Sequence, residues 1–244
     1  DTGHDVKFFG AASGAFMQWD EDENSLVVRG AAADAAGSTG RLSLETAQVS
    51  VEDGDILGRI DWRARLETQG SDASLVSASI WAEADATFTA TVNSTELVFA
   101  TGASETATEK MRIDSAGSVG IGATPESWDS QFKVLNLGIG GVFAASNADA
   151  DYTAHGANWY QTGGADKYVE SSKFATNISQ NNGIMYFATA PSGTADANIT
   201  WSTSMTILAN GKVGIGCTDP ANILNIQVGT GHRVGFWGTS TYCA

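Results

Sequence analysis

The residues best suited to chemistry lie between positions 147 and 168, where aromatic and polar side chains gather. A sugar has an apolar C–H face and a rim of hydroxyl groups, so its binding surface needs a flat aromatic ring beside hydrogen-bonding groups. This stretch offers both. We therefore predict a glycan-binding surface whose candidate residues are Tyr152, His155, Asn158, Trp159, Tyr160 and Tyr168. The alternative is that these aromatics form the core of a small β module, as buried Trp and Tyr commonly do.

Carboxylates in the same stretch raise the question of glycoside hydrolysis. Two carboxylates that flank the scissile bond serve such an enzyme as general acid and as base or nucleophile. Asp149, Asp151 and Asp166 are the candidates, with His155 close to the first two in the sequence. One sequence does not fix their spacing, and aspartates are common in loops rich in Asn and Ala. We therefore expect no catalytic residue and no enzyme activity.

The chain offers no convincing pattern for a metal ion or a cofactor. Its three histidines are isolated and show neither H-x-H nor H-E-x-x-H spacing. Asp20, Asp22 and Asn24 copy the start of a calcium loop, but Ser25 and Ala31 stand where that loop needs Gly and Glu. We expect no metal site and no cofactor.

Charge and composition exclude further classes. The net charge of −15 repels a polyanion, so we expect no nucleic-acid partner. No apolar run approaches the ~18 residues of a membrane span, so we expect no membrane insertion. Cys217 and Cys243 lack the paired spacing of a disulfide framework or a zinc site, and Cys217 is expected to be a small buried filler.

The element that must position these residues is a pattern that occurs twice. M-R-I-D-S-A-G-S-V-G-I-G runs from Met111 to Gly122, and M-T-I-L-A-N-G-K-V-G-I-G runs from Met205 to Gly216. Alternating apolar residues on both sides of a Gly-containing turn predict a β-hairpin in each copy. The residues expected to face a core are Met111, Ile113, Val119, Ile121, Met205, Ile207, Val213 and Ile215.

The glycines between these apolar residues carry a second prediction. Gly120 and Gly214 remove side chains from the other face of the hairpin. Glycine inside a strand usually marks the close approach of another backbone. We expect that backbone to come either from the same chain or from a neighbouring copy.

Alternation and turn residues predict further strands. The expected strands cover residues 5–10, 15–19, 26–28, 56–66, 76–84, 88–92 and 97–99. Residues 31–40 are predicted to be a linker, and residues 55–122 to form a four-stranded antiparallel meander followed by the first motif hairpin. Pro220 could begin one short helical turn between Thr218 and Leu224.

We therefore expect an all-β chain of four parts. They are an N-terminal hairpin module with its linker (1–46), a first module (47–126), a second module with an aromatic insertion (127–220) and the start of a further module or a C-terminal strand (221–244). Because the chain begins at Asp1 rather than Met, we expect it to be a piece of a longer protein.

The repeated hairpin resembles a module that recurs in tail fibres and related virion structural proteins of tailed bacteriophages. The pattern that carries the resemblance is M-R-I-D-x-x-G-x-V-G-I-G-x-T, from Met111 to Thr124. Residues 3–20 and 157–201 are similar to the same group of proteins. The resemblance implies an elongated string of short antiparallel β modules, either hairpins or small sandwiches, intertwined as a parallel homotrimer.

The same resemblance implies a function and partners. It implies a non-enzymatic, extracellular tail-fibre segment of a virion that supports or performs attachment to host-surface glycan. Other copies of the chain, and other virion proteins at the fibre ends, would be its partners. Two alternatives stay open: a tailspike-like polysaccharide depolymerase, and a capsid fibre or extracellular filament subunit built of the same modules.

Overall fold

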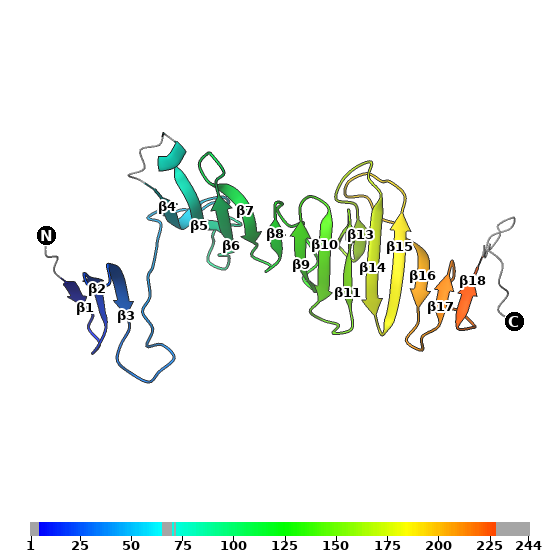
Figure 1. The fold of residues 1–244 in the computed structure, drawn as a ribbon, viewed down its shortest axis with the longest axis horizontal. Helices are drawn as coiled ribbons and strands as arrows, with labels where there is room; N and C mark the ends of the chain where they lie inside the picture. The colour runs from blue at the N-terminus through cyan, green and yellow to red at the C-terminus, as the bar shows by residue number, and fades with distance from the viewer. Residues whose placement is uncertain (1–4, 65–69, 71, 228–244) are drawn as a thin grey trace, which may run out of the picture. The chain divides into compact units, whose positions relative to one another are not determined.

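The computed structural model describes residues 5–64, 70 and 72–227, and its strands are drawn in Figure 1. The chain divides into two compact units, Asp1–Ala47 and Gln48–Ala244. The regular elements of the described residues are strands, apart from one 3-10 turn, η1 (Asp72–Ser74). The prediction of an all-β chain is therefore confirmed.

The first unit contains a three-stranded antiparallel sheet, β1 (Val6–Phe9), β2 (Phe16–Asp20) and β3 (Ser25–Arg29). These are the strands predicted from alternation. Pairing places one set of apolar residues on a single face. The exposed members of that face are Val6, Phe8, Met17, Trp19 and Leu26. Residues 31–47 are all described and form no strand, which agrees with the predicted linker.

The second unit is built on one sheet of thirteen strands, which follow one another across the sheet in chain order. The first six are β4 (Ile56–Arg63), β5 (Val76–Ala84), β6 (Thr95–Thr101), β7 (Thr108–Ile113), β8 (Val119–Ile121) and β9 (Phe132–Leu137). The others are β10 (Gly141–Ser146), β11 (Thr153–Ala157), β14 (Ala175–Asn181), β15 (Ile184–Ala190), β16 (Ser202–Ile207), β17 (Val213–Ile215) and β18 (Leu224–Ile226). A separate hairpin, β12 (Tyr160–Thr162) with β13 (Ala165–Lys167), stands outside this sheet.

Both predicted motif hairpins are present. β7 pairs with β8 and β16 pairs with β17, each around a turn glycine with a φ of 82°, Gly117 in the first and Gly211 in the second. Each hairpin is then followed by a parallel step, β8 to β9 and β17 to β18. Parallel neighbours need a crossover. The crossovers are residues 122–131 and 216–223, and positions 126 and 220, where the first and second modules were predicted to end, fall inside them, between neighbouring strands of one sheet.

Two local predictions are wrong. Residues 88–92 form no strand; Phe88 N instead donates to Val51 O at 2.9 Å, which ties the segment to the start of the unit. The expected helical turn after Thr218 is also not formed, because Pro220 is buried in the crossover and the chain enters β18 at Leu224. Two predicted segments extend beyond the described residues. The strand predicted for residues 56–66 ends there at Leu66, and residues 228–244 of the predicted C-terminal part lie there as well.

One face of the sheet between β9 and β15 is covered by a second layer. This layer consists of the β12–β13 hairpin and the loops around it. The buried cluster between them is Phe132, Val134, Val142, Ala144, Ala154 and Trp159, against which Trp128, Tyr152, Ile199 and Trp201 pack. A smaller cluster joins Tyr168, Ala175 and Ala190. The opposite face of the sheet, named here the open face, carries the other set of alternating side chains.

Candidate functional site

Most of the predicted glycan-binding residues lie inside the second layer. Trp159 is 0% exposed, and its ring meets those of Trp128 and Trp201 edge-on, with centroids 5.1 Å and 6.3 Å away. Tyr160, Tyr168 and Asn158 are also buried. Side chains this deeply buried present no face to a sugar. The expected glycan surface is therefore not formed by these four residues, and the alternative, a small aromatic core, describes them.

The other two candidates are separated from this group. Tyr152 is half-buried and packs against Phe132, with ring centroids 5.6 Å apart. His155 is exposed, and alternation along β11 turns it to the open face, opposite the layer that buries Trp159. The six residues therefore do not converge on one site.

Asn158 is the residue that sends the aromatics inward. Its φ of 59° lies in the left-handed region, which Asn tolerates better than most residues, so the chain turns out of the sheet directly after β11. Its side chain then fixes the neighbouring loop. Nδ2 donates to Glu170 O at 3.3 Å and to Lys173 O at 3.2 Å, while Oδ1 accepts from Glu170 N at 2.7 Å.

Two buried tyrosine hydroxyls in this layer have hydrogen-bond partners. Tyr160 donates to Asp196 Oδ1 and Tyr168 donates to Pro191 O, both at 2.7 Å. Burial, together with Asp196, raises the pKa of Tyr160 to about 12, and burial raises the pKa of Tyr152 to about 12 as well. Tyr160 and Tyr152 therefore stay protonated at neutral pH, and Tyr160 serves as a structural donor.

Two of the three carboxylates of the depolymerase alternative, Asp149 and Asp166, have structural roles. Asp166 accepts from Trp201 Nε1 at 2.7 Å and from Gln161 Nε2 at 3.0 Å. Asp149 accepts from the backbone N–H of Asp151 at 3.0 Å, within the turn before β11. The contacts recorded for Asp149 and Asp166 hold a turn and the second layer together rather than prepare an acid–base pair.

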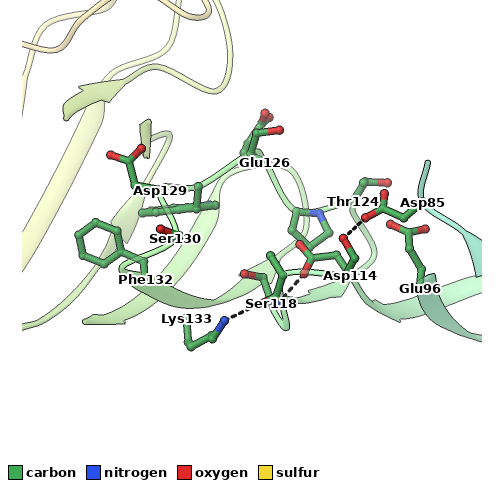
Figure 2. A pocket seen from close by; sticks show the side chains of 15 residues that line it. Asp85, Glu96, Asp114, Ser118, Thr124, Glu126, Asp129, Ser130, Phe132 and Lys133 are labelled. Atoms are coloured by element: carbon green, nitrogen blue, oxygen red, sulfur yellow. Dashed lines mark hydrogen bonds between the residues drawn. The ribbon is translucent and has the colours of Figure 1, made fainter. Parts of the chain in front are cut away.

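An acidic pocket lies at the crossover between β8 and β9, with a volume of about 460 Å³ (Figure 2). Its charged lining consists of Asp85, Glu96, Asp114, Glu126, Asp129 and Lys133. Backbone N–H groups donate hydrogen bonds to two of these carboxylates. Asp129 accepts from Gly163 N and Gly164 N at 2.8 Å and 2.9 Å, and Asp114 accepts from Ser118 N at 2.7 Å. These bonds hold the turns around the junction.

Glu96 in this pocket forms an ion pair with Arg112, which also binds Glu109. Two effects oppose one another at Glu96. Burial raises its pKa to about 7 although the guanidinium of Arg112 lowers it, while hydrogen bonding to Glu109 raises the pKa of Arg112. Both side chains are largely buried, at 15% and 6% exposure, and the cost of removing two charges from water offsets their attraction, so this ion pair is weak evidence for stability.

The glycines of the motif are covered by the crossover that follows them. A Cβ added at Gly120 would lie 2.1 Å from Ala123 O, and one added at Gly214 would lie 2.3 Å from Cys217 O. The backbone predicted to approach these glycines therefore comes from the same chain. Cys217 is half-buried in the second crossover, where its Sγ accepts from Asn225 Nδ2 at 3.4 Å.

The open face carries one row of residues that crosses the whole sheet. Residues paired directly on neighbouring strands lie side by side on the same face. Following the pairs from strand to strand gives a single line, named here the apolar row. Its members are Gly58, Ala82, Leu97, Ile113, Val119, Leu135, Phe143, His155, Ile178, Phe187, Met205, Ile215 and Ile226. His155 is its one polar member.

The described residues leave much of the apolar surface of the row uncovered. Leu97 is 40% exposed, Phe143 53% and Ile215 42%. A second line beside it runs through Ile60, Ile80, Phe99, Met111, Ile121 and Leu137. Ile121 is 43% exposed. The eight residues predicted to form a core therefore lie on the open face, where they are only half-buried or exposed.

Sequence reasoning missed the members of the row outside the two motifs, among them Leu135, Phe143, Ile178 and Phe187. The sequence did contain a signal for Leu135. Leu-Asn-Leu in β9 and Leu-Asn-Ile in β18 pair in the same way with the two motif strands, Leu135 with Val119 and Leu224 with Val213. The repeat therefore extends beyond the hairpin into the next strand.

The described residues also bear on metal binding and on membrane insertion. In that part of the chain, no group of three or more His, Cys, Asp or Glu side chains is arranged to hold a metal ion. Among the same residues, no helix has the length and apolar character that crossing a membrane requires.

Comparison with known proteins gives one kind of match. No protein-family model matches the sequence, and no curated protein matches it. Among solved structures, the chain is similar to the carboxy-terminal domain of the bacteriophage T5 L-shaped tail fibre, with 11% identity, a TM-score of 0.44, and coverage of 88% of this chain and 98% of that chain. The structure of the same domain with its intra-molecular chaperone domain is 12% identical, has a TM-score of 0.42, and is matched over 87% of this chain and 67% of that chain. Values this low establish neither a family nor a function.

Proposed function

We propose that this chain is a non-enzymatic structural segment of a bacteriophage tail fibre, in which copies associate as a parallel homotrimer with their open faces turned toward one another. The apolar row carries this proposal. A sheet with an apolar face must bury it against another layer. Contiguous exposed apolar surface of this kind marks an interaction site rather than a solvent face.

Other copies of the chain are the partner that fits the row best. The row runs through both motif hairpins and through the strands between them. Its partner must therefore match it strand by strand along the sheet. A parallel copy brings the same row to the same level and meets this requirement without a second kind of protein. The resemblance of Met111–Thr124 to modules of phage tail fibres supports the same arrangement.

The proposed role in the virion is support of host attachment. A contact with host-surface glycan would have to use side chains outside the aromatic core, because Asn158, Trp159 and Tyr160 are buried. Other virion proteins would contact the ends of the fibre. The capsid-fibre and filament alternatives use the same modules and differ only in the point of attachment.

The solution mass of the full chain tests the proposal. Light scattering after size-exclusion chromatography should give three times the 25.3 kDa of one chain. The measurement should be repeated over a range of concentrations, because mass action moves a self-associating chain toward the mass of the trimer as the concentration rises. A monomer at all concentrations would overturn the homotrimer and leave the row without its proposed partner.

A further inference from the structure

His155 interrupts an otherwise apolar row at its middle. Its imidazole stacks on the Phe143 ring, with centroids 5.5 Å apart and an interplanar angle of 17°. On the other side it pairs with Ile178. Two shallow hollows of about 460 Å³ and 260 Å³ flank it on the open face, and His155 lines both. Whatever covers the row therefore also covers this imidazole.

The described groups around His155 are apolar or neutral polar side chains and one cation. On its own face, β10 presents Phe143 and Ala145 and β14 presents Ile178 and Gln180. The one charged side chain among the other residues that line the two hollows is Lys133, whose Nζ donates to Ala116 O. A lysine disfavours a second cation nearby. Among the described residues that line the two hollows there is no carboxylate.

We propose that protonation of His155 weakens the association of the copies, so that assembly is sensitive to pH. This inference rests on the proposed function. When the rows meet, water is removed from the imidazole. The stack on Phe143 accommodates either form of the ring, because an aromatic face also attracts a cation. A buried imidazolium without an anionic partner nevertheless carries a desolvation cost that exceeds this attraction, whereas the neutral ring does not.

Proton linkage determines whether association strengthens or weakens as the pH falls. Separated copies leave His155 exposed, and histidine is the side chain type whose charge generally changes between pH 5 and 8. Assembled copies favour the neutral form and so bind fewer protons at this position. Association must therefore weaken as the pH falls through this range. Each His155 contributes up to about tenfold per pH unit, so three copies contribute up to about a thousandfold.

The test compares the full wild-type chain with two variants at pH 7.5 and 5.5 and constant ionic strength. His155→Phe keeps an aromatic ring on Phe143 without a titrating group, and His155→Gln keeps polarity without titration. Sedimentation equilibrium over a concentration series gives the association constant of each protein. We expect the wild type to associate at least about tenfold more weakly at pH 5.5, and both variants to lose most of that difference.

The possible outcomes separate the two proposals. A wild-type chain that remains monomeric at pH 7.5 overturns the proposed self-association, and the inference falls with it. A wild type that assembles equally well at both pH values overturns the inference alone. The inference is also overturned if His155→Phe keeps the full pH difference, because other groups, such as the many carboxylates, would then be responsible.

Discussion

Asn158 determines the environment of the aromatic side chains that follow it. With a φ of 59° it takes the chain out of β11 and across the sheet, so that Trp159 turns toward Trp128. His155, three positions earlier, stays on the opposite face and is exposed. The types of these residues are legible in the sequence. The burial of Trp159 depends on the backbone angle of Asn158, which residue type alone does not give.

Trp159→Ala tests this assignment. Because Trp159 is 0% exposed and packed against two other indole rings, we expect the free energy of unfolding to fall by about 3–5 kcal/mol. Chemical denaturation of the full chain, followed by circular dichroism, measures the change. Phe174→Ala is the matched control, since Phe174 is 73% exposed and its loss should stay within about 0.5 kcal/mol. Equal effects of the two substitutions would place Trp159 outside the core.

The repeated hairpin and its crossover act as one element. The alternating residues and turn glycines predicted the hairpins because hairpin contacts are local in sequence. The parallel step to β9 was not predicted, because its partner strand lies beyond residues 122–131 and no local pattern joins the two. The glycine at position 120 did indicate a close backbone, but pattern alone left open whether that backbone belonged to this chain.

Gly120→Ala tests the fit of the crossover. The added methyl group would lie 2.1 Å from Ala123 O, so the crossover must shift, and we expect a loss of about 1–3 kcal/mol in the free energy of unfolding, measured by chemical denaturation. Gly214→Ala should behave alike. Gly140→Ala is the control in the same unit, because its nearest neighbour would be Asn158 N at an ordinary 3.5 Å. An unchanged unfolding midpoint for Gly120→Ala would show that the crossover does not rest on this glycine.

At the scale of the whole molecule, the open face explains why the predicted core is half-exposed. Alternation correctly placed Met111, Ile113, Val119 and Ile121 together on one face. It could not show that this face lacks a covering layer within the described part of the chain. Beside the motif hairpins, the side that is buried within one chain carries residues such as Gly120 and Asn136, which resemble a solvent face in sequence.

Ile121→Asp combined with Ile215→Asp tests the proposed interface. Both side chains are more than 40% exposed in one chain, so the single copy should keep its β-sheet spectrum. In the proposed trimer each carboxylate would enter an apolar contact without a partner, so we expect the mass measured by light scattering to fall to that of one chain. Ile139→Asp, at the tip of the β9–β10 turn, serves as the control and should leave assembly intact. A double variant that stays trimeric with an unchanged melting temperature would contradict the proposed interface.

The parallel step after each motif makes the stretch between the two copies an exchangeable cassette. Gly122 and Gly216 occupy equivalent places, and each leads through a crossover to a strand that contains Leu-Asn. Recombination that joined Gly122 directly to Cys217 would remove one cassette and still deliver β18 to the edge of β8 in the observed register. A gene built this way can lengthen or shorten its product in whole increments without redesigning any junction.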